Sequence, residues 1–206
     1  HKMSVKSSEI MYSCRDNAAK LFGSENPENI IFTLNCTTAL NTVIKGILKQ
    51  GDHAVISSLE HNAVVRPLET LKKNKIEYSV AECVPYDDEQ TIENFRKQFK
   101  SNTKLVICTH ASNVFGIKLP IERIGALCRL NGILFCVDAA QSAGTADINL
   151  YDSCIDFLCT AGHKGLYGPM GTGLLIINSE TTPDSLIQGG TGSDSANLNQ
   201  PEILRE

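Results

Sequence analysis

The motifs Val137-Asp138-Ala139-Ala140-Gln141-Ser142 and Cys159-Thr160-Ala161-Gly162-His163-Lys164-Gly165-Leu166-Tyr167-Gly168-Pro169 each follow an apolar segment of strand length. Asp138 ends the first of these segments, and Lys164 lies 26 residues later, beyond one further predicted strand. In parallel sheets, ligands bind beyond the carboxyl ends of the strands. The two motifs therefore predict a parallel sheet in which an acid and a lysine occupy neighbouring strand ends.

Strand-length apolar segments alternate with helix-length segments along the whole chain. This alternation is typical of an α/β domain whose sheet is covered by helices on both faces. Pro120 and Gly51 act as start and stop signals for two of the helices. We expect strands at Ile30–Leu34, His53–Ser57, Ile76–Cys83, Lys104–Thr109, Ile133–Asp138, Ile155–Cys159 and Gly173–Asn178, and helices at Ser4–Phe22, Thr38–Lys49, Ala63–Lys73, Thr91–Phe99 and Ile121–Leu130. The expected fold class is α/β with a mostly parallel seven-stranded sheet.

Composition argues against several classes of protein. With 206 residues and 42% hydrophobic content, the chain can bury an ordinary core. The net charge of -4 leaves no basic footprint for nucleic acid. No apolar stretch reaches the ~20 residues that cross a bilayer, and the first residues lack the layout of a signal peptide. We therefore expect a cytoplasmic protein with no nucleic-acid partner and no membrane partner.

The eight cysteines are scattered, and several lie inside apolar runs. None of them forms a C-x-x-C pair. This pattern favours buried, reduced thiols over metal ligands or a disulfide framework, so we expect no metal site.

A lysine and a carboxylate at adjacent strand ends suit the chemistry of pyridoxal 5'-phosphate (PLP). A lysine amine can hold the cofactor aldehyde as a Schiff base, and a carboxylate against the pyridine nitrogen keeps that nitrogen protonated. An ionised Asp138 after an apolar strand is unfavourable unless it meets such a cation. Gly162 and Gly165 flank Lys164 and would allow the backbone to approach a ligand closely. The alternatives are a helix-capping aspartate and a surface lysine.

Further polar residues fall at other predicted strand ends. Thr37 and Thr38 open a helix, where their hydroxyls and the helix amides could hold a phosphate or where they could act as plain N-caps. His61 follows the second predicted strand and could stack on a flat ring or cap a helix. Asn113 follows the fourth and could contact the cofactor or the substrate, or form a turn towards Gly116.

The two opening motifs contribute two more candidates. Gln141 could donate to the phenolic oxygen of the cofactor or simply face solvent, and His163 could reach the phosphate. The glycine-rich segment at 189–193 is open to two interpretations, a cradle for a phosphate or substrate and a structural loop. A nucleotide-binding module is the weakest alternative because no G-x-G-x-x-G follows the first predicted strand.

Five motifs in chain order carry a resemblance to a known family. They are Thr37-Thr38, Glu60-His61-Asn62-Ala63, Ser112-Asn113-Val114-Phe115-Gly116, Asp138-Ala139-Ala140-Gln141 and Gly162-His163-Lys164-Gly165-Leu166-Tyr167-Gly168-Pro169, and they resemble class V aminotransferase-family enzymes. Within that family the resemblance is to the cysteine desulfurase and selenocysteine lyase branch. It implies the large domain of PLP-dependent transferase fold type I over residues 1–193, truncated at the N-terminus. It also implies a loop over 194–206 that leads to a small domain outside this chain.

The resemblance also implies roles for individual residues. Lys164 corresponds to the Schiff-base lysine, Asp138 to the partner of the pyridine nitrogen and His61 to the ring-stacking residue. The implied catalytic residues are Lys164 and His61, and the implied cofactor-binding residues are Thr37, Thr38, His61, Asn113, Asp138, Gln141, His163 and Lys164.

The implied activity is that of a PLP-dependent lyase converting L-cysteine to L-alanine. The sulfur would pass to an enzyme cysteine outside this chain and then to a sulfur-acceptor protein, in an enzyme that is a homodimer at full length. The alternatives are another class V activity, such as an aminotransferase, an epimerase or a kynureninase-like hydrolase, and an inactive cofactor-domain fragment.

Overall fold

A seven-stranded sheet forms the centre of the computed structural model, which describes residues 2–189. The strands are β1 (Ile30–Thr33), β2 (His53–Ser57), β3 (Glu77–Ala81), β4 (Thr103–Thr109), β5 (Leu134–Asp138), β6 (Phe157–Ala161) and β7 (Gly173–Ile177). Their order across the sheet is β1-β7-β6-β5-β4-β2-β3. Strand β7 runs antiparallel to both of its neighbours, whereas all other neighbouring pairs are parallel. The prediction of a mostly parallel sheet is confirmed.

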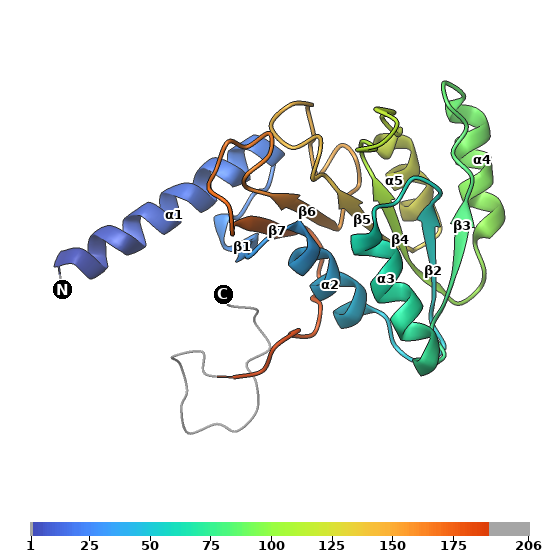
Figure 1. The fold of residues 1–206 in the computed structure, drawn as a ribbon, viewed down its shortest axis with the longest axis horizontal. Coiled ribbons are helices and arrows are strands. Elements are labelled where there is room, and N and C mark those ends of the chain that lie inside the picture. Colours follow the sequence, from blue (N-terminus) through green and yellow to red (C-terminus); the bar gives the residue numbers. More distant parts are fainter. Residues whose placement is uncertain (1, 190–206) are drawn as a thin grey trace.

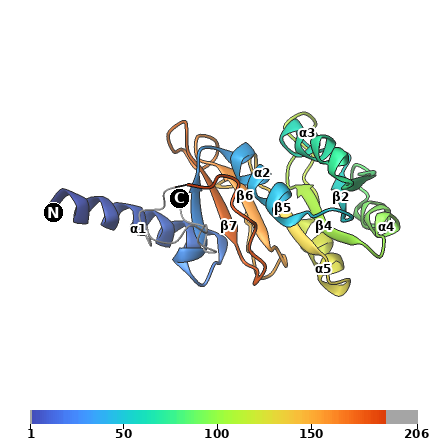
Figure 2. The same ribbon diagram turned by 90° about the horizontal axis from the view of Figure 1, so that it is seen from below.

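Helices cover both faces of this sheet, as the sequence predicts. The helices are α1 (Lys2–Phe22), α2 (Cys36–Ile47), α3 (Asn62–Leu71), α4 (Asp88–Gln98) and α5 (Ile121–Leu130), with short 3-10 turns η1 (Pro27–Asn29) and η2 (Lys72–Asn74). One core cluster joins α2 and α3 to the sheet, and a second joins α1, α4 and α5 to the opposite face. Figure 2 shows α2 and α3 on one side of the sheet and α5 on the other. In Figure 1, α1 extends well beyond the edge of the sheet at β1.

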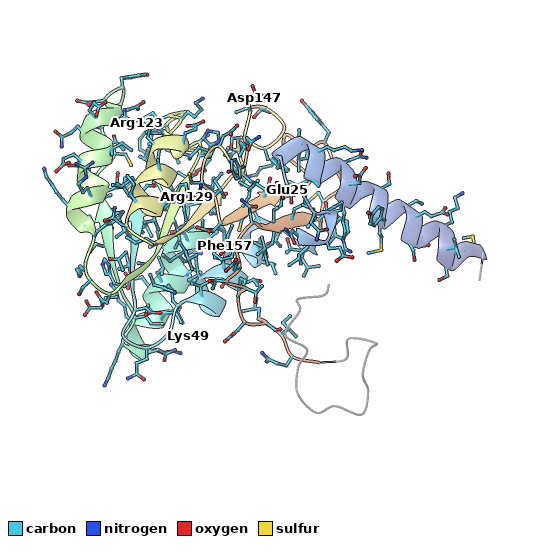
Figure 3. All side chains as sticks on the ribbon, turned by 180° about the vertical axis from the view of Figure 1, so that it is seen from behind. Glu25, Lys49, Arg123, Arg129, Asp147 and Phe157 are labelled. Atoms are coloured by element: carbon cyan, nitrogen blue, oxygen red, sulfur yellow. The ribbon has the colours of Figure 1, made fainter. Side chains whose placement is uncertain are left out.

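The strands form where apolar residues can be buried on both faces at once. In β4, Leu105 and Ile107 belong to the core under α2 and α3, whereas Val106 and Cys108 belong to the opposite core. Such double burial explains why the inner strands of the sheet are largely continuous apolar runs. Phe157, labelled in Figure 3, is among the largest fully buried side chains.

Several element boundaries differ from those predicted, because polar side chains bond to the backbone there. Helix α2 begins at Cys36 rather than Thr38, since Asn35 Oδ1 accepts a hydrogen bond from Thr38 N at 2.8 Å and caps the helix. Strand β6 begins at Phe157 rather than Ile155. The preceding residue, Asp156, instead accepts a hydrogen bond from Phe135 N at 2.7 Å through its side chain.

Six of the eight cysteines are buried free thiols, as predicted: Cys36, Cys83, Cys108, Cys128, Cys136 and Cys159. Cys14 is exposed and Cys154 is half-buried. Within residues 2–189, no three His, Cys, Asp or Glu side chains come together in a way that could hold a metal ion. In the same part of the chain, every helix is too short or too polar to cross a bilayer. The predicted loop over 194–206 lies outside the described residues, as do residues 190–193 of the glycine-rich segment.

Candidate active site

Asp138 is fixed at the carboxyl edge of the sheet by pairing on both sides. It lies opposite Thr109 of β4 and Cys159 of β6. Its carbonyl accepts from His110 N at 2.9 Å, and the next amide, Ala139 N, donates to Cys159 O at 2.8 Å. The side chain is directed to the α2 and α3 face, where Cys36 Sγ lies 3.3 Å from Asp138 Oδ1. With a residue exposure of 5%, its carboxyl group is held in a defined orientation.

Lys164 lies in the turn that follows β6, and this turn packs on the loop that follows β5. A methyl group added to Gly165 would overlap Ala143 O, and one added to Gly144 would overlap Gly165 O. A methyl group on Gly162 would collide with Thr172. These glycines permit a close approach between segments of the protein itself. This contact brings the lysine loop beside the aspartate loop.

Asp138 and Lys164 border the same cavity. The residues that line it are Cys36, Thr37, Leu40, His61, Ala63, Thr109, Ala111, Asn113, Asp138, Ala140, Gln141 and Lys164. Six of the eight predicted cofactor-binding residues are thus brought together. The other two, Thr38 and His163, are not among the lining residues. Thr38 Oγ1 donates to Asn35 Oδ1 at 3.1 Å, and the side chain of His163 is exposed.

The N-terminus of α2 forms one wall of this cavity. Thr37 is the second residue of α2 and is exposed. The first backbone hydrogen bond of the helix runs from Ala39 N to Asn35 O. The amides that come before Ala39 in α2 therefore have no carbonyl partner within the helix. Such a terminus carries partial positive charge and favours an anion, including a phosphate.

His61 both caps a helix and lines the cavity, so the two interpretations of its role are compatible. Its Nδ1 accepts a hydrogen bond from Ala63 N at 3.1 Å at the start of α3. In a neutral imidazole an accepting Nδ1 leaves Nε2 as the protonated nitrogen. The cap fixes the orientation of the ring at the cavity.

Glu60 has a structural role that the sequence did not reveal. Its Oε1 accepts hydrogen bonds from Thr109 N at 2.6 Å and from Ser57 Oγ, so it joins the ends of β2 and β4. Its Oε2 is buried and makes no hydrogen bond within the described residues. Burial raises the pKa of Glu60 from its ordinary value of 4.5 to about 8, opposed by the Ser57 hydrogen bond and assisted by Asp138. The raised pKa favours the protonated form of this carboxyl group near neutral pH.

A carboxyl group, a lysine amine and a helix N-terminus meet at one cavity. This is the set of groups that a pyridine nitrogen, an aldehyde and a phosphate require. The fold and the site together define the class of α/β PLP-dependent enzymes. The family model described as aminotransferase class V matches residues 1–203, and the chain belongs to that family.

Cysteine desulfurases are similar to this chain in both sequence and structure. Cysteine desulfurase IscS of Clostridium botulinum is 33% identical over 198 residues, which cover 92% of this chain and 48% of that protein. A probable cysteine desulfurase of Pyrococcus abyssi is 34% identical over 202 residues, which cover 94% of this chain and 49% of that protein. The chain thus spans about half the length of these curated relatives.

Solved structures agree with this relationship. The apo structure of a cysteine desulfurase from Thermococcus onnurineus NA1 matches with a TM-score of 0.86 at 32% identity, covering 100% of this chain and 52% of that one. SspA in complex with cysteine matches with a TM-score of 0.81 at 29% identity, covering 92% of this chain and 56% of that one. The fold is therefore that of the PLP-dependent fold type I enzymes.

Proposed function

We propose that residues 1–193 form the PLP-binding large domain of a cysteine desulfurase-like lyase, and that 194–206 lead to a small domain. The observation that carries the proposal is that Asp138, Lys164 and the N-terminus of α2 border one cavity. The names of the relatives support the choice of cysteine as the substrate, and their greater length supports the assignment of a single domain.

The residues of the cavity fit the three polar groups of PLP. Lys164 would hold the aldehyde carbon, Asp138 would hold the proton on the pyridine nitrogen, and His61 would lie against the ring. Gln141 would donate to the phenolic oxygen, and Asn113 would contact the cofactor or the substrate. Thr37, which lines the cavity, would bind the phosphate at the N-terminus of α2, and the family resemblance adds Thr38 and His163, which do not line the cavity. When bound, PLP supplies an electron-withdrawing ring that stabilises negative charge at the α-carbon of an amino acid.

Within this arrangement the protein moves one proton and holds another. Lys164 would hold the cofactor at rest, and its Nζ, when free, would take up and return the α-proton of the substrate as a general base and acid. Asp138 would hold the proton on the ring nitrogen. In the complete homodimeric enzyme, the sulfur would pass to a cysteine outside this chain and then to an acceptor protein.

Borohydride reduction tests the assignment of the lysine. The chain is incubated with PLP, reduced with sodium borohydride and digested, and the modified peptide is identified by mass spectrometry. We expect the label on Lys164 and its loss in Lys164→Ala, whereas Lys104→Ala, which removes an exposed lysine of β4, keeps it. Asp138→Ala should weaken PLP binding in the same preparation. Labelling spread over surface lysines, with Lys164 unmodified, would refute the site.

Product analysis tests the choice of substrate. The full-length protein, loaded with PLP and mixed with L-cysteine, should release alanine and retain sulfur on the enzyme. The desulfurase assignment would be refuted if cysteine gave neither product while other amino acids changed the absorbance of the cofactor. That result would favour an aminotransferase, an epimerase or a kynureninase-like hydrolase. A full-length protein that binds PLP and responds to no amino acid would refute the catalytic role.

A further inference from the structure

Cys36 touches the carboxyl group on which the proposed cofactor site depends. It is the first residue of α2, is 7% exposed and lines the same cavity as Asp138 and Lys164. Its Sγ lies 3.3 Å from Asp138 Oδ1, which also accepts a hydrogen bond from Ala140 N at 2.9 Å. Two donors from different segments of the chain therefore meet at the same oxygen of Asp138.

The sulfur is the donor in this contact. Burial raises the pKa of the Cys36 thiol well above its ordinary value, and the neighbouring Asp138 carboxyl raises it further. Cys36 is therefore a thiol rather than a thiolate at neutral pH, and its S–H donates to the carboxylate. A hydrogen bond donated to a carboxylate favours its ionised form.

Cys36 is carried by a rigid part of the fold. The start of α2 is capped by Asn35, which accepts from both the amide and the hydroxyl of Thr38. On its inner side, Cys36 packs into the core cluster that contains Cys136 and Cys159. The thiol is thus held in place from the helix and from the core, and its direction towards Asp138 is fixed.

We propose that Cys36 is a positioning residue for the cofactor. Together with Ala140 N it holds Oδ1 of Asp138, and it thereby orients the carboxyl group that would meet the pyridine nitrogen. This inference rests on the proposed function of the cavity as a PLP site. It concerns a side chain that does not touch the reacting atoms and acts only through Asp138.

Two substitutions distinguish a hydrogen-bonding role of Cys36 from a role in packing alone. Cys36→Ala removes the donor, whereas Cys36→Ser keeps a donor of similar size. In fluorescence titrations of the 206-residue chain with PLP, we expect the Kd of Cys36→Ala to rise about fivefold, the factor that corresponds to ~1 kcal/mol of hydrogen-bond energy. Cys36→Ser should stay within about twofold of the wild type, since its hydroxyl restores the bond.

A spectroscopic measurement reports on the ring proton itself. With isotope-labelled PLP bound, the NMR resonance of the ring nitrogen should shift in Cys36→Ala and return towards the wild-type position in Cys36→Ser. Cys128→Ala is the matched control, because Cys128 is also buried but belongs to the core on the opposite face of the sheet. It should lower stability and leave both the Kd and the resonance unchanged.

The outcomes distinguish this inference from the proposed function. A wild-type chain that binds no PLP would overturn both. PLP binding with the same Kd and resonance in Cys36→Ala as in the wild type would overturn the inference alone. An effect of Cys36→Ala that Cys36→Ser reproduces in full would assign Cys36 to packing only and would also overturn it.

Discussion

Replacing Glu60 by glutamine perturbs the link between the carboxyl ends of β2 and β4. The Glu60 carboxyl accepts hydrogen bonds from Thr109 N at 2.6 Å and from Ser57 Oγ. Burial raises its pKa to about 8, so the folded chain keeps this group protonated at neutral pH. Glutamine has nearly the same shape, retains an oxygen for both donors and cannot ionise.

The expected magnitude follows from the pKa of Glu60 in the two states. The unfolded chain releases this proton near the ordinary value of 4.5 and the folded chain near about 8, so the folded state binds more protons in between. The free energy of unfolding of the wild type therefore falls as the pH rises from about 4.5 to about 8. Below this range Glu60 is protonated in both states and does not lower the stability of the fold. For one such group, the loss between about pH 5 and pH 8 is roughly 3.5 kcal/mol, as an upper limit.

Urea unfolding at these two pH values measures the effect. The difference in unfolding free energy between Glu60→Gln and the wild type should grow in favour of the variant by up to roughly 3.5 kcal/mol from the lower to the higher pH. Taking this difference cancels the contributions of all other titrating groups. Glu25→Gln, at the exposed residue labelled in Figure 3, is the control and should show a constant difference. A difference for Glu60→Gln that stays constant within ~0.5 kcal/mol would refute the reasoning.

Three further substitutions test the fold and the site. Phe157→Ala removes a fully buried ring and should lower the unfolding free energy by about 3–5 kcal/mol in urea titrations, and a loss below ~1 kcal/mol would contradict its burial. Asp87→Ala removes the cap that accepts from Gln90 N and should cost about 1 kcal/mol in the same assay, with an unchanged midpoint as the contrary result. Gly165→Ala forces a methyl group against Ala143 O and should weaken PLP binding about tenfold in fluorescence titrations, and wild-type affinity would show that the loops are free to separate.

Most strands of the fold could be predicted because they are locally continuous apolar runs, with the edge strand β3 as the exception. Strand β5 is an example, since its buried residues are adjacent in sequence and end at Asp138. The helices α2 and α4 begin three residues or fewer before their expected starts, because the side chains of Asn35 and Asp87 cap them by bonding to amides three residues later. The position of β7 between β1 and β6 depends on pairs such as Ile30 with Ile176, which no local pattern contains.

The pair Asp138 and Lys164 could be predicted for a similar reason. Both lie at the ends of strands that are consecutive in the sequence, and β5 and β6 are also neighbours in the sheet. The roles of Glu60 and Cys36 could not be predicted, because their partners are distant. Glu60 bonds to Thr109, 49 positions away, and Cys36 bonds to Asp138, 102 positions away. Their burial results from the assembled sheet and has no signal in the local sequence.

These two hidden contacts have a common electrostatic consequence for the cavity. Burial raises the pKa of both Cys36 and Glu60, so both groups are neutral at pH 7, and both interact with Asp138. Among the described residues that line the cavity, Asp138 is the only one with a carboxyl group and Lys164 is the only lysine, and Glu60 lies outside this lining. An ionised Glu60 would place a second negative charge near Asp138, which would disfavour the ionised form of both carboxyl groups. A protonated Glu60 therefore leaves Asp138 without a second negative charge beside it at the edge of the cavity.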